Sequence, residues 1–358
     1  MDPISLISSI LALFYIGILV YLANQNDLEQ ARYVGPDAVS FHGQQRVTIV
    51  RWMLFGVISL TFIFGLLLIQ MALISSSSEA FREFDMELPQ IDTTTAIVSF
   101  CVALVVSVFC FRLVMSGSTR LWLQRFTGQG SRYNPDSSVH LVALVLVLCF
   151  LSVMFSQFAF IGGLSGLAED VAASGIGIGE LIFQGVLLVV LSLLGVGMAI
   201  RRDVPQTLER LGLQTPSSGD VIVGVGAGIV LFFVSQILFV IWSSLVPADQ
   251  LLEQSAASEQ ITMLFSTIPM AFLLAVIAAV SEEILFRGAM QPVFGLGLTS
   301  VFFALFHNQY LLTPATLIVF IVGAGMGIIR QRRNTNAAII AHFIYNFFPF
   351  LLASMLPQ

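Results

Sequence analysis

The chain is a succession of apolar stretches, each about 20 residues long, the length of helix that crosses the roughly 30 Å hydrocarbon core of a bilayer. Ten such stretches can be drawn, at 4–23, 52–74, 96–116, 140–161, 181–200, 221–245, 266–287, 295–311, 314–330 and 336–356. With 57% hydrophobic and 10% charged residues, no part is long and polar enough for a soluble domain. The sequence therefore predicts an all-α polytopic membrane protein of about ten transmembrane helices.

Cysteines and basic residues argue against several other classes of protein. Cys101, Cys110 and Cys149 lie within apolar stretches and lack CxxC spacing, so we expect buried, unreactive thiols and no disulfide framework. No basic patch indicates a nucleic-acid partner. Residues 4–23 lack the basic leading region of a signal peptide, and we expect them to be retained as the first span.

Arginines mark one side of the predicted bundle. The chain has no lysine, and fourteen of its fifteen arginines flank alternate connections between spans; Arg82 is the exception. The intervening connections, around 79–92, 169–180 and 249–259, are acidic. Because cytoplasmic loops carry the excess of basic residues, we expect the arginine-bearing loops in the cytoplasm and both termini outside.

Two adjacent glutamates and an arginine lie at the end of the seventh apolar stretch, in the segment Ser281–Arg287. An ionised side chain at the bilayer centre costs about 2.5–3.5 kcal/mol on insertion scales, so such residues are functional candidates. Glu283 and Arg287 are spaced i,i+4 with the acid first, which favours a helical ion pair. Glu282 lies about 100° further round the helix and is left available for chemistry.

Two of the four histidines lie in later apolar stretches of the same third of the chain. His307 ends the segment 303–307, and His342 and Asn346 share one helical face because they are four residues apart. If Arg287 marks the cytoplasmic interface, Glu282 lies about 7–8 Å below it at 1.5 Å per residue. We therefore expect these polar residues to meet in a cavity within the cytoplasmic half of the bilayer.

Such a set of residues can hydrolyse a peptide bond in two ways. A glutamate beside a histidine can hold and deprotonate a water molecule, and a histidine with an asparagine can donate hydrogen bonds to a developing oxyanion. One glutamate with two histidines is also a zinc ligand set that leaves a position for water. The residue types alone leave both versions open.

The segments Glu282-Glu283-x-x-x-Arg287, Phe303-x-x-x-His307 and His342-x-x-x-Asn346 resemble the three motifs of the CPBP, or Abi, intramembrane proteases. This family includes CAAX prenyl endopeptidases and bacteriocin-processing enzymes. The resemblance covers about residues 210–358, including Leu211-Gly212-Leu213. It implies a helical intramembrane endopeptidase whose site opens toward the cytoplasm.

The resemblance also implies roles for individual residues. Glu282 and His307 would activate the water, and His342 and Asn346 would stabilise the oxyanion. A glutamate-type mechanism requires no cofactor. In a metal-dependent version Zn²⁺ would be held by Glu282, His307 and His342.

Supporting roles fall to Glu283 and Arg287 by the same resemblance, whereas Phe303 is interpreted as a packing residue. The expected partners are the lipid bilayer and a peptide or protein substrate that is membrane-associated, leader-bearing or CAAX-like, lipidated or not. The expected location is the plasma membrane of a prokaryote, with the active site facing the cytoplasm.

The strongest internal break is Arg201–Asp220, which contains two prolines and a Ser-Ser-Gly turn signal. It predicts an N-terminal five-helix membrane region at 1–200 of unknown role, a cytoplasmic linker at 201–220, and a CPBP-type protease core at 221–358.

The sequence leaves two alternatives to a protease of this type. The first is a non-enzymatic protein, either a proton-coupled transporter using Glu282 and the histidines or a catalytically silent scaffold. The second is another protease class: Gly163-Leu164-Ser165-Gly166 is similar to a rhomboid GxSG but falls on the opposite side from both histidines, and no HExxH is present. The glycines of 323–327 indicate close helix packing.

Overall fold

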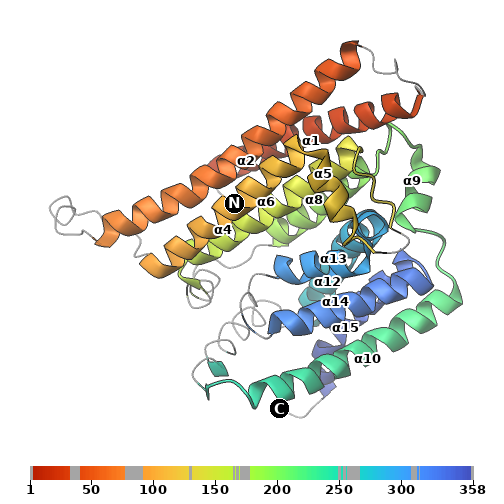
Figure 1. The fold of residues 1–358 in the computed structure, drawn as a ribbon. Coiled ribbons are helices and arrows are strands. Elements are labelled where there is room, and N and C mark those ends of the chain that lie inside the picture. Colours follow the sequence, from red (N-terminus) through yellow and green to blue (C-terminus); the bar gives the residue numbers. More distant parts are fainter. Residues whose placement is uncertain are drawn as a thin grey trace.

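The computed structural model describes residues 3–32, 41–76, 92–128, 131–163, 166, 169, 178–248, 251–252, 255, 267–307, 313 and 315–355. These residues form helices and contain no β-strand (Figure 1). Nine of the helices within these ranges are long and apolar enough to cross a membrane. The predicted all-α polytopic membrane fold is confirmed.

The N-terminal helices form one side of the bundle, and four of them share an apolar core. They are α1 (Pro3–Arg32), α2 (Phe41–Ser76), α4 (Thr93–Met115), α5 (Gly117–Gln124), α6 (Ser138–Phe160) and α8 (Ile178–Gly195). Leu19, Leu54, Val114 and Cys149 are buried where α1, α2, α4 and α6 meet. The expectation that all three cysteines are buried is wrong for Cys101, which lies on an outward face of α4.

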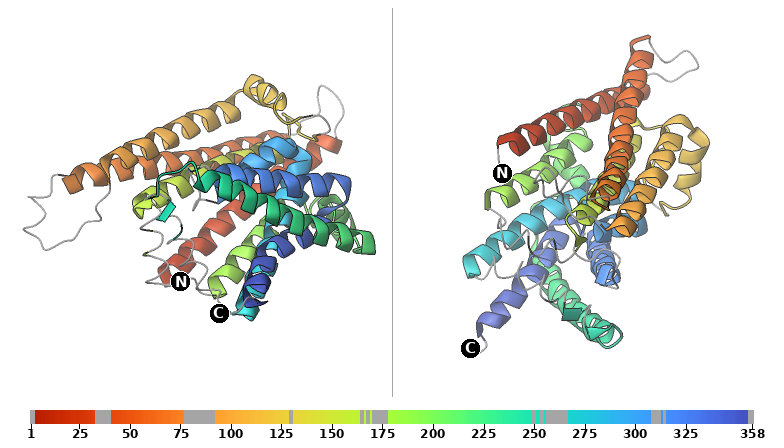
Figure 2. Two further views of the ribbon diagram at one scale, coloured as in Figure 1. Left: turned by 90° about the horizontal axis from the view of Figure 1, so that it is seen from below. Right: turned by 90° about the vertical axis from the view of Figure 1, so that its left-hand side faces the viewer.

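The C-terminal helices form the other side of the bundle. They are α9 (Val204–Leu211), α10 (Ser218–Ser243), α12 (Ile268–Glu283), the π-helix η1 (Ile284–Met290), α13 (Gln291–Phe306), α14 (Ala315–Arg332) and α15 (Thr335–Met355). α15 packs against both α10 and α12, and α13 packs against α14. In Figures 1 and 2 (right), α1 and α2 lie on the opposite side of the molecule from α10 and α15.

The two sides share a hydrophobic core. Phe286 of η1 and Phe302 of α13 belong to the same buried cluster as Leu113 of α4 and Leu144 of α6. α8 also packs along α12 and η1. The N-terminal helices therefore form part of the surroundings of the segment that carries the two glutamates, and the predicted boundary at residues 201–220 remains a prediction.

The predicted seventh and eighth spans follow each other without a loop within Ile268–Phe306 and count together, so nine candidate spans are found among the described residues rather than ten. The helix continues past Arg287 through the wide turn of η1. It is interrupted at the single residue Gly295, with φ 77° and ψ 172°, rather than by a loop. A one-residue break of this kind leaves no polar connection in the sequence to mark it.

Gly295 is expected to tolerate no side chain. Its φ is positive, and a Cβ there would lie 1.9 Å from the carbonyl oxygen of Thr127. Gly295→Ala should lower the free energy of unfolding by at least about 1–3 kcal/mol, measured by chemical unfolding in detergent. Gly297→Ala is the matched control, because a Cβ at Gly297 meets nothing within 4 Å and alanine favours a helix. Equal stability of the two variants would contradict this account of the break.

The structure places some of the arginines from which the membrane topology is predicted. Arg132, Arg201, Arg202, Arg210 and Arg330, from three different connections, lie close enough to interact electrostatically. Most of the acidic connections, and Arg82, lie outside the described residues. The orientation of the bundle across the membrane therefore remains a prediction.

Candidate active site

A buried ion pair joins the middle of η1 to the end of α12. Arg287 Nε lies 3.2 Å from Glu283 Oε2, and the side chains are 1% and 0% exposed. Arg287 also donates from Nη2 to the Gly323 carbonyl of α14, at 3.0 Å. The ion pair expected from the i,i+4 spacing is present.

Arg287 lies inside the bundle rather than on its outer surface. Its guanidinium lies 4.3 Å from the ring centroid of Phe303 and 5.8 Å from that of Phe286, within the bundle. The cause is η1, which carries the helix onward and turns Arg287 toward α14. The depth of Glu282 counted from Arg287 remains a prediction.

The second carboxylate oxygen of Glu283 forms a hydrogen bond with His342. Nδ1 of His342 lies 2.9 Å from Glu283 Oε1, and this contact links α15 to α12. Since the carboxylate paired with Arg287 is an acceptor, the imidazole donates through Nδ1–H, which leaves Nε2 for other partners. The sequence pattern paired Glu283 only with Arg287 and therefore missed this contact, which depends on how two distant helices pack.

Glu282 and His307 face each other without bonding directly. Glu282 Oε2 is 3.9 Å from His307 Nε2, and each side chain is 23% exposed. Among the described residues Glu282 Oε2 has no hydrogen-bond partner although the atom is buried. The predicted pairing of these two residues in space is therefore observed, at a distance that leaves a gap between them.

The hydrogen on His307 is fixed by its other nitrogen. Nδ1 lies 2.9 Å from the backbone carbonyl of Phe303. Because a carbonyl only accepts, Nδ1 carries the hydrogen and Nε2 of the neutral ring presents a lone pair. Glu282 Oε2 and His307 Nε2 are then two acceptors facing each other, and a water molecule satisfies both by donating one hydrogen to each.

Phe303 lies between the parts of this site. Its ring centroid is 4.7 Å from that of His307 and 6.0 Å from that of His342, and the Arg287 guanidinium lies over it. Phe303 is 3% exposed, as a packing residue should be. The structure adds that it packs against both histidines at once.

The four side chains predicted to carry the chemistry line one cavity of about 2580 Å³: Glu282, His307, His342 and Asn346. Asn346 follows His342 by one turn of α15. Apolar residues of α1, α6 and α8 form other parts of the wall, including Ile16, Leu146 and Leu188. A large and mostly apolar cavity with a few convergent polar groups is typical of a binding or active site.

A metal ion does not fit the arrangement of these residues. The described part of the chain contains no group of three His, Cys, Asp or Glu side chains that could hold one. Of the set proposed for zinc, Glu282 faces His307, while the bond from His342 to Glu283 is made through Nδ1 and does not itself occupy Nε2. The chemistry of the site is therefore derived from its own side chains.

The fold and the cavity define an integral membrane protein with a polar site enclosed among apolar helices. Residues 264–348 match the family model described as type II CAAX prenyl endopeptidase Rce1-like. The match spans about a quarter of the chain and includes all four cavity residues named above. No curated protein and no solved structure matches the chain.

The family match confirms the resemblance to the CPBP membrane proteases that the three motifs predict. It supports a CAAX-type intramembrane endopeptidase in general terms, with a peptide substrate and a lipid environment. The N-terminal helices lie outside the matched residues, so nothing in the match describes their contribution.

Proposed function

We propose that the protein is an intramembrane endopeptidase in which Glu282 and His307 activate a water molecule for hydrolysis of a peptide bond. The observation that carries this proposal is the gap between Glu282 Oε2 and His307 Nε2. Two acceptors 3.9 Å apart, one of them a buried carboxylate oxygen without a partner, form a place where a water is held and polarised.

Each proton in the reaction has a place to go. Glu282 takes a proton as the water oxygen attacks the peptide carbonyl, and a tetrahedral oxyanion forms. Asn346 and His342 are the residues on α15 that line the cavity, and the amide N–H of Asn346 can donate to that oxyanion. His342 can donate from Nε2 as well when its ring is the imidazolium ion, because Nδ1–H is already bonded to Glu283. As the carbon–nitrogen bond breaks, Glu282 returns its proton to the leaving amine.

Glu283 and Arg287 support this arrangement without touching the substrate. Glu283 fixes the ring of His342 through Nδ1, and Arg287 fixes Glu283 while bonding to the Gly323 carbonyl. The pair thus ties α12, α14 and α15 together behind the catalytic side chains. This assigns positioning roles to both residues.

The substrate is a membrane-associated peptide, leader-bearing or CAAX-like, with or without a lipid. The apolar walls that α1, α6 and α8 add to the cavity suit a peptide or lipid chain within the membrane. The arginines gathered on one side favour a cytoplasmic position for that end of the bundle, with both termini outside and a prokaryotic plasma membrane as the location.

Purified protein should cleave at least one member of a panel of farnesylated and unlipidated peptides in detergent or vesicles. The new peptide termini are identified by mass spectrometry, and the Glu282→Gln variant serves as the inactive control. A zinc chelator should leave the rate unchanged, because the mechanism is derived without a metal. Inhibition by the chelator that is reversed by added zinc would contradict the glutamate-type mechanism. Cleavage that persists in Glu282→Gln would contradict the assignment of Glu282 to the active site.

Asn346→Ala should reduce kcat by about 10²–10³-fold with little change in KM, because an oxyanion donor acts mainly in the transition state. Steady-state kinetics on the cleaved peptide measure this. The matched control is Asn336→Ala, the same change on the same helix at a residue that does not line the cavity. Equal kcat values for the two variants would remove Asn346 from the proposed mechanism.

A further inference from the structure

Four arginines gather at one end of the large cavity, and we call them the arginine cluster: Arg132, Arg201, Arg202 and Arg210. They come from the α5–α6 connection, the α8–α9 connection and α9. All four lie outside residues 264–348, which match the family model. The positive charge at this end of the cavity is therefore supplied by a part of the chain that the family match does not describe.

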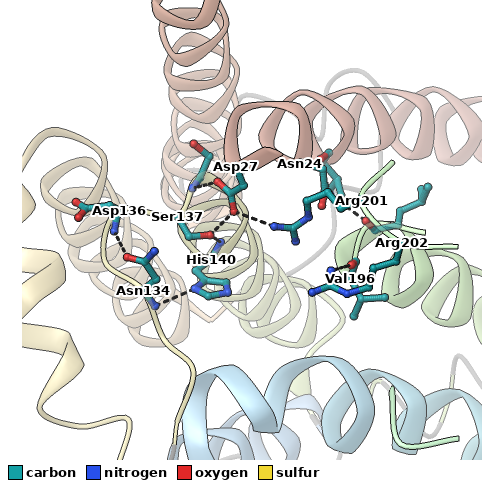
Figure 3. A network of polar contacts seen from close by, with 12 residues as sticks. Asn24, Asp27, Asn134, Asp136, Ser137, His140, Val196, Arg201 and Arg202 are labelled. Carbon is teal, nitrogen blue, oxygen red and sulfur yellow. Dashed lines mark hydrogen bonds and ion pairs between the residues drawn. The ribbon is translucent and has the colours of Figure 1, made fainter. Parts of the chain in front are cut away.

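The charge of the arginine cluster is compensated only in part. Among the described residues one carboxylate forms an ion pair with it, since Asp27 Oδ2 lies 3.4 Å from Arg201 Nη1. The hydroxyl of Ser137 also donates to this carboxylate. Figure 3 shows Arg201 directed at Asp27 and Arg202 at the carbonyl of Val196, which accepts a hydrogen bond without neutralising the charge. Four cationic side chains thus share one carboxylate within the described structure.

The surroundings of these side chains favour an anion. Burial, together with the neighbouring Arg202, Arg132, Arg330 and Arg201, lowers the pKa of Arg210 to about 10. In addition, Arg201 Nε is buried and has no hydrogen-bond partner among the described residues. An anionic group between the arginines would offset their mutual repulsion and accept a hydrogen bond from this Nε–H.

An apolar wall continues from the arginine cluster along the N-terminal helices. On α1, Asp27 is followed toward the N-terminus by Ala23, Val20 and Ile16, which line the cavity at the spacing of one helical face. Ile16 precedes Asp27 by about 16 Å of helix at 1.5 Å per residue. This is about half of the roughly 30 Å hydrocarbon core, the depth that the acyl chains of one leaflet fill. The cavity wall on α6 and α8 is also mainly apolar and includes Leu146, Leu188 and Leu191.

We propose that the cavity holds an anionic phospholipid, with its phosphate at the arginine cluster and an acyl chain along the apolar face of α1. The guanidinium fork matches a phosphate, and basic pockets between transmembrane helices bind anionic headgroups. Arg210 donates to the carbonyl of Gly288, six residues after Glu282, so the phosphate site lies more than one helical turn from the catalytic glutamate. The proposal gives the N-terminal helices a lipid-binding role and does not depend on the endopeptidase function.

The test measures lipid binding to the delipidated wild-type protein in detergent by native mass spectrometry, without any peptide. Phosphatidylglycerol should bind about 10- to 50-fold more tightly than phosphatidylcholine with the same acyl chains, the scale of two or more arginine contacts. Inorganic phosphate should displace phosphatidylglycerol only in large excess, because it lacks the acyl chain. Equal affinities for the two lipids would overturn the proposal. So would displacement by phosphate at the concentration of the lipid, which would assign the arginine cluster to a soluble anion.

The double variant Arg132→Gln/Arg202→Gln removes two charges of the arginine cluster and keeps the ion pair of Arg201 with Asp27. It should bind phosphatidylglycerol as weakly as phosphatidylcholine, with the affinity for phosphatidylcholine unchanged. Arg332→Gln, at an exposed arginine outside the cavity, is the matched control and should bind both lipids as wild type does. An undiminished preference for phosphatidylglycerol in the double variant would contradict the proposal. The comparison of the two lipids on wild type holds whether or not the double variant folds.

Photocrosslinking locates the acyl chain independently. Phosphatidylglycerol with a diazirine midway along one acyl chain is bound to wild type and irradiated, and the labelled residues are mapped by mass spectrometry. Labels should fall on the cavity-facing residues of α1, α6 and α8, such as Ile16, Leu146 and Leu188. Labels confined to outward residues such as Phe14, which is 67% exposed, would show a lipid on the outer surface of the bundle and overturn the proposal. Neither experiment requires cleavage, so a failed lipid site leaves the proposed endopeptidase function in place.

Discussion

Glu282→Gln is expected to reduce kcat for peptide cleavage by about 10²–10⁴-fold, the usual contribution of a general base. The free energy of unfolding should stay within about 0.5 kcal/mol of wild type, as for a change that removes no packing and breaks no protein hydrogen bond. Glu282 is partly exposed to the cavity, and its Oε2 bonds to no other described residue. Initial rates and chemical unfolding of the same preparation measure the two quantities.

Glu209→Gln on α9 serves as the control for Glu282→Gln, since Glu209 is exposed and does not line the cavity. It should match wild type in rate and stability. A Glu282→Gln protein that is folded and fully active would contradict the assignment of the base. A Glu282→Gln protein that is inactive because it is unfolded would show that the glutamate is structural.

Glu283→Gln should have the opposite effect, although the two glutamates are adjacent. It leaves the fully buried Arg287 without its counter-charge, and breaking one partner of a buried ion pair costs about 3–5 kcal/mol. We expect a loss of this size in the free energy of unfolding. Activity should fall mainly because less protein is folded, which activity corrected for the folded fraction would show.

A double variant that lacks both charges shows whether the loss of stability in Glu283→Gln comes from the unpaired charge on Arg287. In Glu283→Leu/Arg287→Met the buried charge is gone, and apolar replacements of similar volume are often neutral for stability. We expect the double variant to be more stable than Glu283→Gln yet slow in catalysis, because the anchor of His342 is lost. A Glu283→Gln protein as stable as wild type would contradict the supporting role of the pair.

The membrane fold could be predicted from the sequence because span length is set by the bilayer and apolar composition is unambiguous. What the pattern missed is the junction of α12, η1 and α13. A π-helical turn followed by a single positive-φ glycine changes the direction of the chain without a polar loop, so the sequence suggests two spans where the structure has one bent element.

The residues of the site could be predicted from the sequence better than the hydrogen bonds between them. Unusual polar residues on three apolar stretches indicated Glu282, His307, His342 and Asn346, and all four line one cavity. The bond from His342 to Glu283 could not be predicted, since it joins residues 59 apart through helix packing. The burial of Arg287 was missed for the same reason.

The arginines indicate membrane topology in the sequence, but only the structure shows that some of them also line the cavity. From the sequence they indicate only the side of the membrane, by their alternation along the loops. In space Arg202 and Arg210 also face the cavity that holds Glu282. Residues that indicate membrane topology in the sequence thus also line the candidate site.

The most direct test of the central claim is the single-turnover rate of peptide cleavage by purified wild type and Glu282→Gln in the same vesicles, with the products identified by mass spectrometry. The account predicts defined new termini formed by wild type and a rate lower by at least about 10²-fold in the variant. Termini formed at equal rates by both proteins would contradict it. No cleavage of any peptide by wild type would favour a transporter or a silent scaffold instead.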